Sequence, residues 1–152
     1  MSQRTFQFRL RSSHAATDHA SNHATGSPVV EFLTESGEWQ PQNPSLTTPG
    51  FRLYLLSLLL CQHHYLVANA QERGIPLQQV EGSFTVITSA DWILEQLHGT
   101  FRLQLDPHAP DAERSRATPD AMAFINERMT LCPVSRNLPP GVQKTIRLDH
   151  DG

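Results

Sequence analysis

The sequence has few cysteines, and their spacing excludes several kinds of site. Only two occur in 152 residues, Cys61 and Cys132. Two cysteines cannot hold a disulfide-rich scaffold or a four-cysteine metal site. They also lie too far apart in the sequence for a CxxC redox or zinc motif. The length is that of one ordinary domain, which buries roughly two-thirds of its unfolded surface, so we expect a single domain over residues 1–152.

Charge and long apolar runs are also scarce. Charged residues make up 18% of the sequence and the formal net charge is -3, which indicates neither general disorder nor a basic nucleic-acid-binding surface. The longest apolar stretch, from Leu53 to Cys61, has about nine residues, whereas a membrane helix needs roughly 20. We therefore expect no nucleic-acid partner and no membrane partner.

The first residues predict the cellular location. Met1 to Thr5 lead directly into an alternating segment, without the apolar core and cleavage site of a secretory signal. We therefore expect a cytoplasmic protein. In a reducing cytosol two thiols normally stay free, so a disulfide between them would be transient and catalytic rather than structural.

The first third of the sequence predicts strands and one long loop. Apolar and polar residues alternate over Thr5–Arg11, which is typical of a half-buried strand. The small and polar stretch Ser12–Pro28 predicts a mobile loop. Two further short strands, Val29–Thr34 and Glu38–Gln40, flank the dipeptide Ser36-Gly37 and should form a hairpin.

A long helix should follow. Thr48 can cap it and Pro49 suits its first position, so we expect a helix from about Pro49 to Arg73. Gly74 and Pro76 should end it. Its first half is apolar nearly all round, and such a helix is buried on every side. Something must therefore cover both of its faces.

The remaining elements complete an α+β order. Strands are expected at about Val80–Ser89 and Trp92–Leu105, a helix capped by Thr118 up to Cys132, a helical turn over Val134–Leu138 and a last strand over Val142–Leu148. In the capped helix Met122, Ile125, Met129 and Cys132 share one apolar stripe. The order predicts an α+β fold with helices stacked on a largely antiparallel sheet.

The two cysteines differ in their local surroundings. Cys132 stands where Pro133 breaks a helix, and if it caps the next turn, the amide dipoles and Arg136 would favour its thiolate. Cys61 lies in the apolar helix, where burial raises the pKa of a thiol and leaves it inert. From the residues alone, each cysteine is either a plain core residue or a reactive thiol.

Two segments resemble a known family. Residues Pro49–Pro76 carry a cysteine about a dozen residues into a long helix that ends in GIP, and they resemble the central helix of OsmC/Ohr-type proteins. Residues Cys132–Leu138 read CPVSRNL and resemble the family's CPVSxxL signature. The resemblance covers roughly residues 43 to 149. It implies an OsmC-like fold, with an antiparallel sheet packed on a long central helix and a second helix, in an intertwined homodimer.

The resemblance also implies an activity, the thiol-dependent reduction of organic hydroperoxides by peroxiredoxin-like chemistry. Cys61 would be the peroxidatic thiolate that becomes a sulfenic acid. Cys132 would be the resolving thiol that condenses with it into a disulfide, and an external dithiol would then reduce this disulfide. The chemistry uses no metal and no bound cofactor.

The sequence departs from the family at the residues that activate the first cysteine. Family enzymes place a glutamate about ten residues before it, but here that position is Phe51. They also use an arginine from the N-terminal strand and loop region, for which Arg9, Arg11 or Arg52 could substitute here. Without a cation near Cys61, its thiolate is costly to form and attack on peroxide would be slow.

This departure leaves a second interpretation open. The chain could be a catalytically weak or inactive protein of the same fold that binds a small apolar ligand or a partner at the dimer cleft. Phe51 and the leucine-rich helix would line such a pocket.

Histidines and one arginine offer further alternatives. His14, His19 and His23 could bind zinc or another metal, with help from the pair His63-His64, or they could be solvated loop residues, since their spacing matches no closed zinc motif. On a helix, His63 and His64 should point away from the sulfur of Cys61, toward the sheet or solvent. Arg136 could bind a carboxylate or phosphate, or form a salt bridge at the dimer surface.

Overall fold

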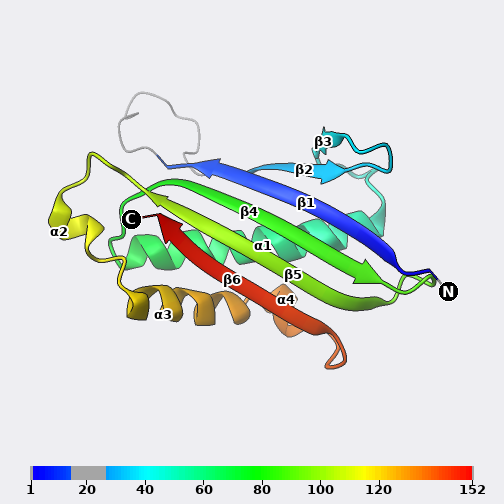
Figure 1. The fold of residues 1–152 in the computed structure, drawn as a ribbon. Helices are drawn as coiled ribbons and strands as arrows, with labels where there is room; N and C mark the ends of the chain where they lie inside the picture. The colour runs from blue at the N-terminus through cyan, green and yellow to red at the C-terminus, as the bar shows by residue number, and fades with distance from the viewer. Residues whose placement is uncertain (1, 15–26, 152) are drawn as a thin grey trace.

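The fold combines one sheet with helices, as the order of the predicted elements indicates. A computed structural model describes residues 2–14 and 27–151 (Figure 1). Its elements run in the order β1 (Arg4–Ser13), β2 (Val29–Leu33), β3 (Trp39–Pro41), α1 (Gly50–Glu72), β4 (Leu77–Thr88), β5 (Leu94–Leu105), α2 (Asp111–Arg114), α3 (Pro119–Thr130), α4 (Pro133–Arg136) and β6 (Gln143–Asp151). The predicted α+β class is confirmed.

The strands form one six-stranded sheet in the order β3-β2-β1-β4-β5-β6. Neighbouring strands are antiparallel, except that β6 runs parallel to β5. The predicted hairpin of β2 and β3 is present and turns at Gly37, whose φ of 85° lies in the left-handed region that glycine favours. The loop predicted from Ser12 begins later than expected, because β1 continues to Ser13. Most of that loop, residues 15–26, lies outside the described residues.

The C-terminus of α1 follows the sequence prediction, whereas its N-terminus does not. At its end Gly74 adopts a φ of 68°, as expected of a left-handed cap. The expected cap by Thr48 is wrong, because the helix begins at Gly50 and Pro49 occupies the capping position without a side-chain hydrogen bond. Thr48 instead accepts a hydrogen bond from the amide of Ser45 in the preceding turn.

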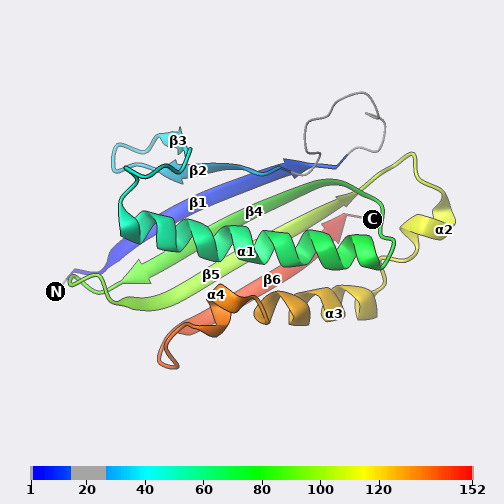
Figure 2. The same cartoon turned by 180° about the vertical axis from the view of Figure 1, so that it is seen from behind.

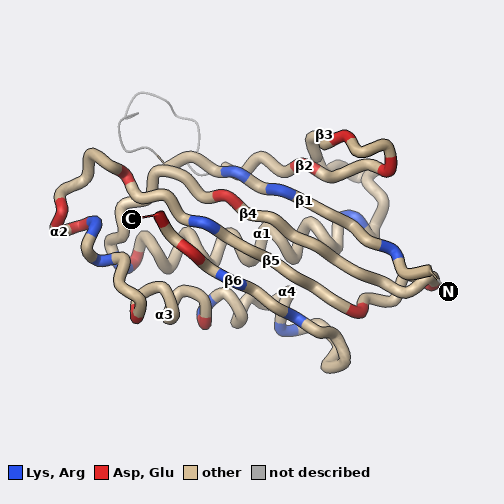
Figure 3. Tube along the Cα trace, in the orientation of Figure 1, with Lys and Arg blue, Asp and Glu red and all other residues tan. Residues whose placement is uncertain are grey.

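The helices cover one face of the sheet. Figure 2 shows α1, α3 and α4 side by side on this face, and α1 contacts both α3 and α4. Acidic and basic residues are interspersed along the strands (Figure 3). Arg9 pairs with Glu31 at 2.8 Å, and Arg102 pairs with Asp151 at 2.8 Å. The apolar core therefore lies between the helices and the sheet.

Burial of α1 differs from the expectation. On the sheet side Leu55, Leu58, Leu59 and Leu66 are buried. On the opposite side Leu53 and Tyr54 are 37% and 36% exposed. The prediction that α1 is buried all round is thus wrong for a single chain, because one chain supplies only one sheet to cover it.

The C-terminal helices follow the sequence signals closely. Thr118 caps α3 by accepting a hydrogen bond from the amide of Ala121 at 3.1 Å. The stripe of Met122, Ile125, Met129 and Cys132 is buried as predicted. The short helix α2 was not predicted, and none of its residues is buried. Within the described part of the chain, no helix is both long enough and apolar enough to span a membrane.

Candidate redox site at Cys61 and Cys132

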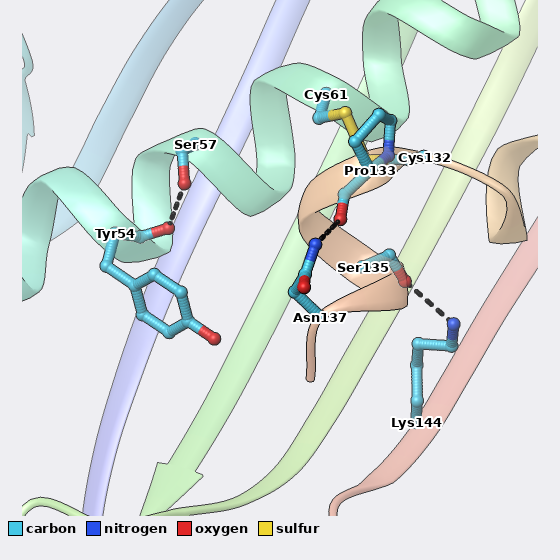
Figure 4. Close-up of a disulfide and its surroundings, with 8 residues drawn as sticks. All are labelled: Tyr54, Ser57, Cys61, Cys132, Pro133, Ser135, Asn137 and Lys144. Carbon is cyan, nitrogen blue, oxygen red and sulfur yellow. Dashed lines mark hydrogen bonds between the residues drawn. A yellow bond between two sulfur atoms is a disulfide. The ribbon is translucent and has the colours of Figure 1, made fainter. Parts of the chain in front are cut away.

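The two cysteines of the chain are joined to each other. Cys61 on α1 and Cys132 before α4 form a disulfide, with their Cα atoms 6.0 Å apart and their positions separated by 71 in the sequence (Figure 4). Pro133 explains how Cys132 reaches α1. Its ring removes one backbone donor and disfavours helical geometry at the residue before it, so α3 ends and the chain turns at Cys132.

The two sulfur sites are unequally exposed. Cys132 is fully buried at 0% exposure, because it continues the buried stripe of α3. Cys61 is only partly buried, because it lies beside the face of α1 that turns away from the sheet. Cys61 is therefore the cysteine that solvent and small molecules reach first.

The turn that carries Cys132 is tied to the last strand. Lys144 of β6 donates a hydrogen bond from Nζ to Oγ of Ser135 at 2.7 Å, and Ser135 is only 3% exposed. Burial lowers the pKa of Lys144 from its ordinary value. Asn137 adds a second restraint, donating from Nδ2 to the carbonyl of Pro133 at 2.7 Å (Figure 4). Together these bonds hold α4, and with it Cys132, in place.

His63 lies on another side of α1 from Cys61. Its Nε2 is 2.7 Å from Oγ of Ser12 on β1, and Nε2 of His14 lies 2.7 Å from the same oxygen. Burial, reinforced by the charges of His14 and His64, lowers the pKa of His63 to about 4. His63 is thus neutral at pH 7, and it joins α1 to β1 rather than supplying a cation to Cys61.

The histidine expectations have mixed outcomes. His63 meets the sheet and His64 is exposed, as predicted. His19 and His23 of the suggested metal set lie outside the described residues. Within the described ranges, no three His, Cys, Asp or Glu side chains are grouped so as to hold a metal ion. Arg136 is exposed and forms no ion pair with any described residue of this chain, so the salt bridge expected of it at a dimer surface stays a prediction.

The three arginines that could replace the family arginine have other contacts. Arg9 and Arg11 alternate along β1 with buried residues that face α1, so they project from the opposite face of the sheet. There they pair with Glu31 and Glu81. Arg52 stacks on the ring of Phe32, 4.6 Å from its centroid.

Phe51, at the position of the family glutamate, belongs to an aromatic cluster at the start of α1. Its ring lies 5.7 Å from that of Phe6 and 5.4 Å from that of Trp92. The cluster borders an apolar cavity of about 150 Å³. Trp92 was predicted to begin a strand, but β5 begins at Leu94 and Trp92 has a φ of 67° in the preceding turn. Its place in the cluster could not be predicted from the sequence.

A search of solved structures finds several that are similar to this chain. A protein from Psychrobacter arcticus 273-4, named for osmotic stress induction and a detoxification response, matches with a TM-score of 0.51 and 12% identity over 79% of this chain and 87% of that chain. An OsmC-like hydroperoxide resistance protein from Jannaschia sp. CCS1 matches with a TM-score of 0.47 and 14% identity over 88% and 86%. An organic hydroperoxide resistance protein OsmC from Legionella pneumophila matches with a TM-score of 0.42 and 12% identity, over 93% of this chain and 96% of that chain.

The likeness to the Psychrobacter protein establishes the fold. This chain shares the α+β fold of that protein, and the predicted sheet packed on a long central helix and a second helix is confirmed. The intertwined homodimer stays a prediction. No protein-family model and no curated protein matches the sequence. At 12% identity the likeness defines the architecture alone, and the chemistry has to be argued from the site.

Proposed function

We propose that this protein reduces organic hydroperoxides through a two-cysteine cycle in which Cys61 reacts with the peroxide and Cys132 resolves the product. The observation that carries the proposal is the pairing of the two cysteines across α1 and α4. Nothing in the sequence spacing requires this contact. The contact arises because the turn at Cys132 and Pro133 brings Cys132 against α1 in the folded chain.

The proposed cycle balances without a metal or bound cofactor. The Cys61 thiolate attacks the distal oxygen of ROOH, the O–O bond breaks, and the alkoxide takes a proton to leave as ROH, which leaves Cys61 as a sulfenic acid. The thiolate of Cys132 then attacks the Cys61 sulfur, and hydroxide leaves as water after protonation. An external dithiol reduces the disulfide in two exchange steps and becomes a disulfide itself.

The unequal exposure of the cysteines supports these roles. A peroxidatic cysteine must be reached by its substrate, and Cys61 is the more accessible of the pair. A resolving cysteine needs only to reach the first sulfur, and Cys132 is fully buried against α1. Buried thiols are protected from competing oxidants, so Cys132 stays available for the second step.

The rate of the first step should be modest. His63 is neutral at pH 7, while Arg9 and Arg11 face away from α1. Arg52 precedes Cys61 by nine residues, which is about 13 Å along a helix axis. Without a neighbouring cation to stabilise it, the thiolate of Cys61 is costly to form, so its attack on peroxide is slow.

Two cysteine variants test the proposed roles. With Cys132→Ser, treatment with cumene hydroperoxide should leave a sulfenic acid on Cys61, detected by mass spectrometry after dimedone trapping. With Cys61→Ser, no oxidation product should form at Cys132, because a fully buried thiol does not meet the peroxide. Oxidation first at Cys132 would reverse the roles, and oxidation at neither residue would refute the activity.

We also propose that the working form is a homodimer. The outer face of α1 exposes Leu53 and Tyr54, and a second copy would cover this apolar surface. Light scattering of wild-type protein should give twice the chain mass of 17.0 kDa. Leu53→Glu should give the mass of one chain, whereas Glu35→Gln in the β2–β3 turn should stay dimeric. A monomeric wild-type protein would contradict the proposed dimer. It would not bear on the thiol cycle, which the cysteine variants test separately.

A second candidate function rests on the apolar cavity beside Phe51. A protein of this fold with weak activity could bind a small apolar ligand there, and the apolar lining of this cavity within one chain supports that candidate. Its test is a rise in Tm with neutral aromatic compounds that persists in the Cys61→Ser/Cys132→Ser double variant. Absence of any rise would leave the peroxide chemistry as the sole candidate.

A further inference from the structure

At the start of α1, the cavity beside Phe51 is almost entirely apolar. Its lining consists of Phe6, Phe8, Phe32, Pro49, Phe51, Arg52, Leu55 and Trp92. Its volume of about 150 Å³ suits one aromatic ring, since apolar cavities of about this size in proteins take up benzene. The end of a ligand that enters this cavity should therefore be apolar and about the size of one aromatic ring.

The rings around the cavity are arranged about Phe6. Its centroid lies 5.5 Å from that of Trp92 and 6.4 Å from that of Phe32. Trp92 reaches this position from a left-handed backbone conformation, with a φ of 67°, which a bulky side chain adopts only when its packing compensates. The cluster is therefore a formed aromatic surface, onto which another ring can stack or pack edge-on.

Two guanidinium groups lie on the same rings. Arg4 stands 4.5 Å from the centroid of Trp92, and Arg52 stands 4.6 Å from that of Phe32. Both also line a wider, more polar groove of about 810 Å³ that shares Phe6, Phe32 and Trp92 with the cavity. The cavity thus opens beside a surface that carries two positive charges.

Neither arginine is neutralised by an acid in the described parts of the chain. The four ion pairs found there use Arg9, Arg11, Arg102 and Arg114. Arg4 donates to the carbonyl of Ala90 instead, and the first turn of α1 has no acidic residue beside Arg52. The groove contains one carboxylate, Glu35 in the β2–β3 turn, so its lining keeps a positive balance.

We propose that this site binds a small arylalkyl carboxylate, with its ring in the cavity beside Phe51 and its carboxylate on Arg52 and Arg4. A guanidinium offers paired N–H donors that match the two oxygens of a carboxylate. The ring of such a ligand would fill the apolar cavity, and its carboxylate would pair with the guanidinium groups. This proposal goes beyond the second candidate function, which asks only for an apolar ligand.

Trp92 can report the binding directly. The chain has two tryptophans, so Trp39→Phe leaves Trp92 as the single indole fluorophore. This variant, in its disulfide-bonded form, is titrated with 4-phenylbutyrate and separately with the uncharged 4-phenylbutanamide. The carboxylate should give a saturable change in fluorescence with a Kd about tenfold lower than that of the amide.

Arginine variants identify the source of the preference. Arg52→Met and Arg4→Met should each reduce the ratio of the two Kd values toward one. Arg73→Met is the matched control, because Arg73 stacks on Phe124 at 3.8 Å, far along α1 from the cavity, and should keep the full ratio. If an arginine variant fails to fold, the Kd ratio of acid to amide in the Trp39→Phe protein, which keeps both arginines, still tests the proposal.

The outcomes separate this inference from the proposed functions. Equal Kd values for acid and amide would overturn it while supporting the second candidate function. Absence of a saturable change with either compound would overturn both. Peroxide turnover does not enter the measurement, so failure of the thiol cycle leaves the result unaffected.

Discussion

His63 and Cys61 stand two residues apart on α1 and lie in opposite environments. Cys61 lies beside the exposed face, while His63 is buried at 4% exposure and hydrogen-bonded to Ser12. The two residues are close in the sequence, but helix geometry predicts that their side chains point in different directions. The helix separates them, and the histidine becomes part of the core.

The buried His63 should make stability depend on pH. The unfolded chain takes up its proton near the ordinary pKa of 6.5, but the folded chain does so only near 4. Stability is therefore complete above pH 6.5 and falls as the pH is lowered from 6.5 to 4, by at most about 3 kcal/mol. Urea unfolding at several pH values should show this fall in wild type and a smaller one in His63→Gln.

His64 provides the control for this prediction. It is the exposed neighbour of His63, so His64→Gln should leave the pH profile close to that of wild type. A wild-type free energy of unfolding that stays constant between pH 6.5 and 4, or an equal effect of both variants, would contradict the assignment to His63.

At the scale of single elements, α4 shows how a four-residue helix is held in place. Besides the bond from Asn137 to the carbonyl of Pro133, two contacts from other elements restrain it, namely Lys144 of β6 and the disulfide to α1. CPVS predicted the break and the turn, because proline acts locally. The same motif did not indicate Lys144 as the partner of Ser135, because that contact depends on how β6 lies beside β5.

The bond between Lys144 and Ser135 can be measured by a double-mutant cycle. Ser135→Ala should destabilise the protein by about 1 kcal/mol, because it removes the acceptor of a partly buried ammonium group. Lys144→Met alone should cost a similar amount. If the two groups act through their hydrogen bond, the double variant should cost clearly less than the sum of the single variants. Strict additivity would show that the bond contributes nothing.

Periodicity predicted the elements better than it predicted their surroundings. The alternation in β1 and the three- and four-residue steps of α3 fixed which faces are buried, because those faces depend on local geometry. The partial exposure of Cys61 did not follow from its apolar helix, because it depends on which helices pack together. Trp92 was misplaced because a tryptophan in a left-handed turn has no local signal.

For the whole molecule, the disulfide closes a long loop between α1 and α4. It joins residues 71 positions apart, and a loop of that length stabilises the folded state by about 4 kcal/mol through the entropy of the unfolded chain. Wild type should therefore unfold at a clearly lower denaturant concentration after reduction. The Cys61→Ser/Cys132→Ser variant should not respond to reductant. Equal midpoints for oxidised and reduced wild type would contradict a structural contribution.

This stability difference bears on the proposed cycle. A catalytic disulfide must open and close, so the reduced protein has to stay folded without the cross-link. Most of the core between the sheet and α1 consists of other residues, and Phe84, Phe101 and Leu59 among them are fully buried. We therefore expect the reduced form to keep its fold while it is less stable.

The central claim is that hydroperoxide oxidises Cys61 and that Cys132 closes the disulfide. The most direct measurement starts from fully reduced wild-type protein and adds one equivalent of cumene hydroperoxide per chain, followed by titration of free thiols under denaturing conditions. The account predicts that the titre falls from two thiols per chain to none, with a Cys61–Cys132 peptide found on mapping. A titre that stays at two after prolonged treatment would contradict it.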